Sequence, residues 1–377
     1  SGTLTTIFPH SSDLSIDMLT SLPSLMIIPF IIIGGKLTEK MGMVRLLKIG
    51  LWIFMISGVL YLFANKMWEL LVISGLLGVG AGLIIPLSTG LISKYFVGSQ
   101  RVKQFGYSSS ITNFTLVFAT AIAGYLAEIN WHLPFLVYVL PAVSLLLVRY
   151  LDDSPNAPSI ELTATNMKSE VAELPKYVDI GGSKYGIHVK HLIELMLFYG
   201  TATIAVLAII LNLSFLMTEH HFSSGDSGLM ISLFFLAIMT PGLFLDTIVK
   251  RCRKLTKAFS MLLITVGLFL IWIAPLEWLI ISGCILCGFG YGIIQPLMYD
   301  KATHTALPEK ETMALAYVMV MNYLAILVYP FIVTFLQDMF HTQSQELPFI
   351  LNILIALGGF IWAYCRRNEF LFNDQLN

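Results

Sequence analysis

Charged residues are scarce in this 377-residue chain, since Asp, Glu, Lys and Arg together make up 12% of it. Hydrophobic residues make up 56%, and the mean hydropathy is +0.80. A soluble globular domain carries about 25% charged residues, so this composition excludes a soluble protein. The net charge of −1 gives no attraction to nucleic acid. Most of the chain is therefore expected to lie in lipid.

Cysteine is also rare, with residues only at Cys252, Cys284, Cys287 and Cys365. We expect no disulfide framework, because all four fall within apolar runs or toward the side that is predicted below to be cytoplasmic. Cys284 and Cys287 have CxxC spacing, but two small thiols one turn apart in an apolar helix are packing residues. No metal and no cofactor are expected.

Signals of catalysis are missing as well. The sequence has no HExxH, no clustered His and no GxSxG in a suitable setting, so an intramembrane enzyme lacks its metal ligands or nucleophile. No basic segment followed by a short apolar core marks a signal peptide. A sensor without transport has no support either, because the polar linker is too short for a signalling domain. We expect neither an enzyme nor a sensor.

Long apolar runs are abundant. A helix needs about 20 apolar residues to cross the hydrocarbon core, and these runs lack the alternation that is typical of strands. Eleven are long enough to be spans: 18–37, 45–64, 68–93, 104–127, 131–150, 191–217, 226–247, 256–275, 277–300, 312–336 and 347–365. The expected fold class is all-α, a polytopic membrane protein.

The basic residues test this assignment, because Lys and Arg gather in the cytoplasmic loops of membrane proteins. If the eleven spans alternate in direction, every basic residue except Lys66 falls on one side of the membrane. That separation would fail if a central span were invented or missed. The rule predicts a cytoplasmic C-terminus and places Ser1 outside.

A ten-residue stretch occurs nearly twice, 210 positions apart. Gly78–Leu87 reads GVGAGLIIPL and Gly288–Leu297 reads GFGYGIIQPL, so six of the ten residues match. Internal repeats of this kind mark duplicated transporters. The GxxxG spacing lets helices approach closely, and Pro86 and Pro296 permit bends. We expect packing to explain most of the glycines.

The duplication predicts two pseudo-symmetric six-helix bundles, of which five plus six spans are visible. We expect that a first helix is absent from this chain. Residues 151–189 are polar and carry three prolines and a Gly-Gly pair, so they cannot cross a bilayer. The predicted domains are an N-terminal bundle at 1–150 that lacks most of its first helix, a cytoplasmic linker at 151–189, and a C-terminal six-helix bundle at 190–377.

The segment Gly35–Arg45 reads GKLTEKMGMVR. It resembles the cytoplasmic signature of the major facilitator superfamily, a Gly-x-Leu-x-Asp-Arg-x-Gly-Arg loop between the second and third helices. The stretch from Phe8 to Pro23 resembles the join between the first two helices in bacterial drug-efflux members. Glu39 replaces the usual Asp, Lys40 keeps the positive charge, and the later basic residue is displaced to Arg45.

The resemblance implies a cytoplasmic gate that consists of Gly35, Glu39, Lys40, Gly42 and Arg45. A weaker copy follows from Gly242 to Asp246, 207 residues on. A carboxylate at a helix end and basic residues in a tight loop can pair across two bundles and hold one conformational state. The alternative is that these charges only follow the positive-inside rule.

Two departures from the family pattern bear on the subfamily. Many relatives carry an Arg four residues before the first repeated glycine, where this chain has Ser74. Drug antiporters usually have a Gly-Pro pair in the fifth helix, where this chain reads ATAIAG at 119–124. The resemblance therefore supports the superfamily more firmly than the antiporter subfamily.

Polar groups within the spans are the default markers of a transporter's binding site, because they are costly in lipid. The predicted substrate-binding residues share this position, with amides or aromatic hydroxyls at mid-membrane depth: Asn113, Asn212, Gln295, Asn322, Tyr199 and Tyr291. Gln295 stands out because the first repeat has Ile85 in its place. For each amide, an ordinary interhelical hydrogen bond is the competing explanation.

No ionisable residue lies in the central third of any visible span, so an obvious proton carrier is missing. Three options remain open. The carboxylate is on the absent helix, or proton coupling uses Glu194, Asp246 or Asp300 in a water-filled vestibule, or the protein is a facilitator. We prefer the first two.

The sequence predicts a secondary active transporter in the bacterial cytoplasmic membrane, which moves a small lipophilic or amphipathic organic molecule by alternating access. Proton-coupled efflux is the leading hypothesis, and an importer, a facilitator or a lipid-precursor flippase of the same fold is the alternative. The expected partners are the substrate, protons and the bilayer, and the expected state is a monomer.

Overall fold

The computed structural model describes residues 13–130, 132–151, 186–222, 224–273, 276–342 and 344–373. In these ranges the chain is helical, and its only β contact is an isolated bridge between Ile187 and Ala306. The expected all-α class is confirmed. Most of the predicted linker, 152–185, lies outside the described residues.

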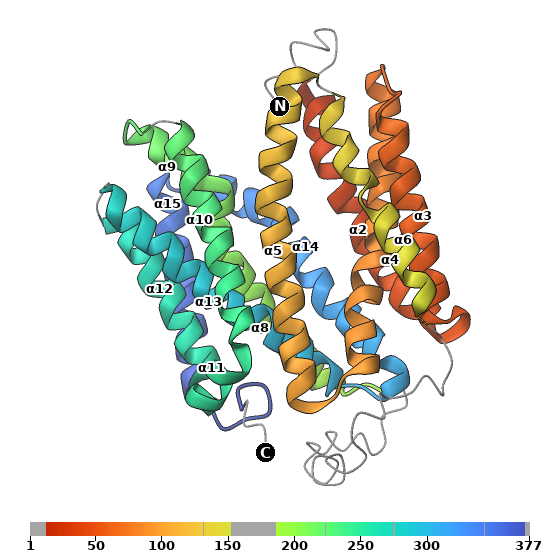
Figure 1. The fold of residues 1–377 in the computed structure, drawn as a ribbon. Coiled ribbons are helices and arrows are strands. Elements are labelled where there is room, and N and C mark those ends of the chain that lie inside the picture. Colours follow the sequence, from red (N-terminus) through yellow and green to blue (C-terminus); the bar gives the residue numbers. More distant parts are fainter. Residues whose placement is uncertain are drawn as a thin grey trace. The chain divides into compact units, whose positions relative to one another are not determined.

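The helices follow the predicted apolar runs (Figure 1). Their bounds are α2 Asp13–Met41, α3 Met43–Tyr61, α4 Met67–Tyr95, α5 Gly98–Ile129, η1 Leu133–Val139, α6 Pro141–Leu147, η2 Val148–Tyr150, α8 Val189–Leu207, η4 Ala208–Asn212, α9 Leu213–Glu219, α10 Ser224–Leu243, α11 Leu245–Cys252, η5 Arg253–Leu255, α12 Thr256–Ile273, α13 Glu277–Thr303, η6 Pro308–Lys310, α14 Glu311–Met339 and α15 Glu346–Cys365.

Ten helical segments within the described ranges are long and apolar enough to cross a membrane. The predicted run at 104–127 is not among them, although α5 is continuous over 32 residues. Side chains such as Ser109, Thr112 and Asn113 lower its hydropathy. The length of α5 is sufficient for a membrane span, but its hydropathy is too low. Its assignment as an eleventh span stays a prediction.

The helix that begins at Val189 changes its hydrogen-bond register in the η4 segment, which is a π-helix. An extra residue in the i→i−4 ladder frees a carbonyl, and such segments recur at functional sites. Asn352 of α15 is fully buried, and its Nδ2 donates to the carbonyls of Ile204 (2.9 Å) and Ala205 (3.3 Å), one turn before η4. The same nitrogen contacts the hydroxyl of Tyr329 at 3.0 Å. Asn352 therefore stabilises the irregular turn.

The described chain forms two compact units. Unit 1 contains α2, α3, α4 and α6, together with α5 from Phe118 onward and α14 up to Tyr323. Unit 2 contains the helices from α8 to α13 and α15, together with α5 up to Val117 and α14 from Leu324 onward. The first parts of α5 and α14 thus group with helices from the other half of the sequence. The predicted domain boundaries, which divide the chain by sequence halves, stay a prediction.

The repeated glycines of unit 1 lie where α4 meets its neighbours. A Cβ atom added to Gly78 would lie 2.6 Å from the Pro23 carbonyl oxygen of α2, and one added to Gly80 would lie 2.7 Å from the Phe54 nitrogen of α3. Both distances are too short for any side chain, so glycine is required for this close approach. Nearby, the Ser74 hydroxyl of α4 donates to the Leu19 carbonyl of α2 at 2.9 Å.

Unit 2 repeats this packing with α13 in the role of α4. A Cβ atom added to Gly288 would lie 2.8 Å from Ala237 of α10, and one added to Gly290 would lie 2.6 Å from the Ser260 carbonyl oxygen of α12. Alternate glycines of each repeat therefore face two different helices. This explains physically why the same spacing occurs twice.

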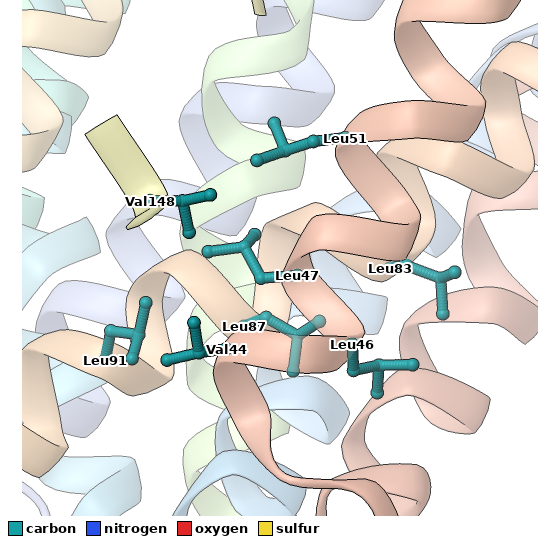
Figure 2. Packing of buried hydrophobic residues seen from close by; sticks show 8 residues of the cluster. All are labelled: Val44, Leu46, Leu47, Leu51, Leu83, Leu87, Leu91 and Val148. Carbon is teal, nitrogen blue, oxygen red and sulfur yellow. The ribbon is translucent and has the colours of Figure 1, made fainter. Parts of the chain in front are cut away.

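We call η1, α6 and η2 together the α6 region. A hydrophobic cluster holds α3, α4 and the end of this region together in unit 1 (Figure 2). Its buried members come from three elements: Val44, Leu46, Leu47 and Leu51 of α3, Leu83, Leu87 and Leu91 of α4, and Val148 of η2. Val148 is 3% exposed and lies beside Leu47 and Leu51 in the figure. The chain thus returns to α3 just before Leu151.

Candidate functional site

A row of uncharged polar side chains runs along one face of α13. Tyr291, Gln295 and Tyr299 are spaced four residues apart, so they lie above one another on the helix. The Ser109 hydroxyl of α5 donates to Gln295 Oε1 at 3.1 Å, and Gln295 Nε2 donates to the Tyr299 hydroxyl at 3.3 Å. Gln295 thus joins α5 to α13 within unit 2 and uses both its acceptor and its donor.

The row continues onto α8 through three tyrosines. The Tyr199 and Tyr299 hydroxyl oxygens are 3.2 Å apart, and the Tyr291 hydroxyl donates to Tyr199 at 3.4 Å. Thr203, one turn after Tyr199, lies 3.2 Å from the Tyr291 hydroxyl. The Tyr199 and Tyr291 rings stack with centroids 6.5 Å apart. We call the six residues Ser109, Gln295, Tyr299, Tyr199, Tyr291 and Thr203 the polar chain.

The polar chain is buried in an apolar surrounding. Tyr199 has no exposed surface, and Thr203 and Tyr291 are 2% and 7% exposed, whereas Gln295 and Tyr299 keep a larger exposed fraction. A buried hydroxyl without a partner is costly, so each member holds its neighbour in place. Gln295 and Tyr299 are the members that a ligand can reach without unfolding the unit.

Of the three predicted asparagines, Asn113 lies one turn after Ser109, a member of the polar chain, on α5. It is 8% exposed, and its Nδ2 donates to the Ser109 carbonyl at 2.8 Å. Asn212 ends the π segment, and its buried Oδ1 has no hydrogen-bond partner in the described ranges. Asn322 belongs to the part of α14 in unit 1. The structure therefore places Gln295, Tyr199 and Tyr291 in one network, with Asn113 beside it.

Asp300 forms a buried ion pair at the far end of α13. Arg101 Nε of α5 donates to Asp300 Oδ1 at 2.9 Å, and the two residues are 5% and 6% exposed. Arg101 Nη2 lies 2.7 Å from His304 Nε2, which also lies 3.6 Å from Asp300 Oδ2. Because a guanidinium only donates, the His304 nitrogen accepts from it.

Asp246 lies where α5 meets the start of α11. Its Oδ2 accepts from Lys250 at 3.0 Å and lies 3.5 Å from the Lys103 ammonium of α5, while its buried Oδ1 has no hydrogen-bond partner among the described residues. Nearby, Gly106 of α5 and Gly242 of α10 approach so closely that a Cβ on either would clash with the other's carbonyl oxygen. Asp246 and Asp300 therefore both contact the beginning of α5.

The predicted gate residues lie at the end of α2 and the start of α3. A Cβ on Gly35 would come 2.9 Å from that of Ala316 on α14, so glycine is needed there too. Glu39 lies 3.7 Å from the Lys310 ammonium, within unit 1. Gly42 has a φ of 71°, in the left-handed region that favours glycine, and it joins α2 to α3. Lys40 and Arg45 flank this turn.

The start of α14 packs in unit 1, and the start of α5 packs in unit 2, through different kinds of contact. In unit 1, a Cβ on Gly90 of α4 would come 2.7 Å from the Thr312 hydroxyl of α14. The position 210 residues after Gly90 is Asp300, which pairs with Arg101 of α5. Close approach of small residues in one unit is replaced by an ion pair in the other.

Glu194 has a structural partner. It forms an ion pair with Arg366, just after α15, and lies 3.8 Å from His191 Nδ1. Arg366 also pairs with Glu369, whose carboxyl pKa is lowered by that contact. Glu194 therefore holds the segment after α15 against α8, and it lies on a different part of unit 2 from the start of α5.

Sequence reasoning missed several members of these networks. In the sequence, Arg101 and His304 resemble ordinary charged residues near a membrane face. Their contacts with each other and with Asp300 are visible only in the structure. Tyr299 could have been found, because it continues the four-residue spacing of Tyr291 and Gln295. Ser109 gave no signal, since hydroxyls commonly bond their own helix.

Comparison with known families gives a match over most of the chain. The family model described as Major Facilitator Superfamily matches residues 2–330 and 193–370. The quinolone resistance protein NorA of Staphylococcus aureus is 32% identical over 115 residues, which are 30% of this chain and 29% of NorA. The multidrug transporter protein MdtP of Bacillus subtilis is 34% identical over 106 residues, 28% of this chain and 20% of MdtP. The chain thus spans less than a third of the length of either relative.

Solved structures share the fold over nearly the whole chain. The human organic anion transporter MFSD10 (TETRAN) gives a TM-score of 0.75 at 17% identity and covers 95% of this chain and 87% of its own. The proton:xylose symporter XylE gives 0.76 at 15% identity and covers 100% and 92%. At these identities, the likeness is one of fold alone.

Proposed function

The chain belongs to the major facilitator superfamily of membrane transporters, and from that premise we propose that it exports a small lipophilic or amphipathic molecule across the bacterial cytoplasmic membrane, coupled to protons. The names of NorA, a quinolone resistance protein, and MdtP, a multidrug transporter, support export. The predicted orientation, with the basic face cytoplasmic, is part of this proposal.

The polar chain is the observation that carries the proposed substrate class. Its members are hydroxyls and an amide with no formal charge, and three of them present aromatic rings. A planar ligand can stack on the Tyr299 ring and exchange hydrogen bonds with Gln295 or Tyr299, the two members that keep some exposure. Tyrosine faces also attract lipophilic cations without a carboxylate. Strongly hydrated anions find no counter-charge in this network.

Asp300 is the proposed site of proton coupling. Protonation removes its charge and leaves Arg101 without its anionic partner, which weakens the hold of α13 on the start of α5. Proton binding would then favour the state in which α5 moves away. Asp246 has the same relation to Lys103 and is the second candidate.

Transport into proteoliposomes with an acidic interior tests the substrate site. We expect the wild type to accumulate a fluorescent lipophilic cation, and Gln295→Leu to reduce the initial rate by about 2- to 10-fold, the value of one hydrogen bond. Asn212→Ala is expected to act in the same direction, because its buried Oδ1 has no hydrogen-bond partner among the described residues. Ser282→Ala is the matched control, since this α13 hydroxyl bonds its own helix at Trp278. Full activity of both site variants with unchanged thermal stability would remove this site.

Dependence on the pH gradient separates coupled export from the second candidate, facilitated diffusion. The absence of a charge from the polar chain favours facilitation, because no proton carrier contacts the ligand there. We expect wild-type accumulation to stop when the gradient is collapsed, and Asp300→Asn to equilibrate substrate without accumulating it. Wild-type uptake that ignores the gradient would favour the facilitator.

A further inference from the structure

A groove of about 390 Å³ lies between α3 and the α6 region, away from the networks described above. It is lined by Lys48, Trp52 and Met55 on α3, and by Ala142, Leu146 and Arg149 on the α6 side, with Leu145 beside them. We propose that this groove binds an anionic phospholipid of the cytoplasmic leaflet. All of its residues belong to unit 1, and the proposal does not depend on the transported substrate.

The groove has one basic end and one apolar end. Lys48, Trp52 and Met55 are spaced by four and three residues, so they share one face of α3. Val148 and Leu47 belong to one buried cluster, so their neighbours Arg149 and Lys48 lie at the same end of the groove. Ala142 lies seven residues before Arg149, toward the other end. Seven helical residues span about 10 Å. A lipid phosphate at the basic end therefore places its acyl chain along the apolar walls.

Buried packing on both sides fixes the width of the groove. Val148, next to Arg149, packs against Leu47 and Leu51 of α3 (Figure 2). At the other end, the rings of Tyr61 and Phe135 stack with centroids 4.4 Å apart and planes 5° from parallel. The groove is therefore preformed, and a ligand that fits it has little ordering cost to overcome.

The two basic residues of the groove have no protein partner in the part of the chain that the structure describes. Neither Lys48 nor Arg149 makes an ion pair or hydrogen bond within the described ranges. Other basic residues on the same predicted face do have acids, as Lys250 has Asp246 and Lys310 has Glu39. Basic pockets between transmembrane helices on the cytoplasmic side bind anionic headgroups. A lipid phosphate supplies the missing counter-charge.

Trp52 marks the depth of the site. Its side chain is 53% exposed between the basic end and the apolar wall, and Leu146 across the groove is 58% exposed. Tryptophan is enriched at the level of lipid headgroups, where its ring contacts hydrocarbon and its N–H contacts water. Lipid bound in the groove must therefore contact the Trp52 ring.

Fluorescence quenching by brominated lipids tests the proposal. Two variants keep a single tryptophan, Trp52 or Trp68, and are reconstituted in phosphatidylcholine with a minor fraction of brominated phosphatidylglycerol or brominated phosphatidylcholine. We expect Trp52 to favour phosphatidylglycerol by roughly 30-fold, since each of two basic residues at a membrane surface contributes about 1 kcal/mol. Trp68 is the matched control, since it is 61% exposed, near Lys66, and does not line the groove.

The expected preference at Trp52 disappears in Lys48→Gln/Arg149→Gln. Equal quenching by both lipids at Trp52, or a preference that survives the double substitution, would overturn the proposal. Native mass spectrometry gives a second readout with all tryptophans present. There we expect Lys48→Gln/Arg149→Gln to lose a retained phosphatidylglycerol that Lys190→Gln/Arg251→Gln keeps. Equal retention by the two variants would also contradict the site.

Discussion

Removal of the Asp300 charge is expected to release the start of α5 from unit 2. The Arg101 guanidinium is 5% exposed and donates to Asp300 at 2.9 Å. When one partner of a buried ion pair is removed, the remaining charge is left without compensation, which costs about 3–5 kcal/mol. In Asp300→Asn, His304 Nε2 still accepts from Arg101. We therefore expect the lower end of that range, about 3 kcal/mol.

Hydrogen exchange of peptides from residues 98–117 measures this release. A loss of about 3 kcal/mol corresponds to roughly a 100-fold faster exchange, if opening of this contact limits the exchange rate. Peptides from α12 should keep the wild-type rate, because their contacts do not involve Arg101. The same variant should show a lower thermal midpoint.

The double variant Arg101→Gln/Asp300→Asn provides the control. With both charges removed, no unpaired ion remains at this contact, and two neutral amides can pair. We expect it to recover most of the lost protection. If Asp300→Asn exchanges like the wild type, or if the double variant is no better protected than the single one, the ion pair does not hold the start of α5.

Three further outcomes are expected from single positions. Asn352→Leu leaves carbonyls near the π segment and the Tyr329 hydroxyl unpaired, so we expect a loss of about 1–3 kcal/mol in chemical denaturation; an unchanged midpoint would count against this role. Gly290→Val forces a side chain against α12 and should cost about 1–3 kcal/mol, whereas Gly358→Val, with open space around it, should be tolerated in the same assay. Glu194→Gln should accelerate exchange near Arg366 without changing the pH dependence of transport, whereas a changed pH profile would support the predicted role of Glu194 in proton coupling.

The helices were predictable because each apolar run had the length of a span and no strand-like alternation. The repeated glycines were predictable for a different reason, because close helix approach leaves only glycine as an option at positions such as Gly80 and Gly290. The turn at Gly42 was also readable, because its positive φ requires a residue that tolerates the left-handed region. Local constraints of this kind leave a trace in the sequence.

Pairings between distant segments were not predictable. Ser109 and Gln295 are separated by 186 positions, and Arg101 and Asp300 by 199. Neither pair has a local signature, because each residue type also occurs where it bonds its own helix or water. The grouping of the first parts of α5 and α14 with the other half of the sequence was not predictable either. The sequence repeat indicates two halves but does not indicate which helices pack with the other half.

Photolabelling shows whether substrate contacts the polar chain of unit 2. A lipophilic cation with a photoreactive group is irradiated with the reconstituted protein, and the labelled peptides are identified. We expect label on α8 near Tyr199 and on α13 between Tyr291 and Tyr299, and we expect excess unlabelled compound to remove it. Label confined to other helices, or label on α8 and α13 that excess compound does not remove, would show that substrate does not bind at the polar chain.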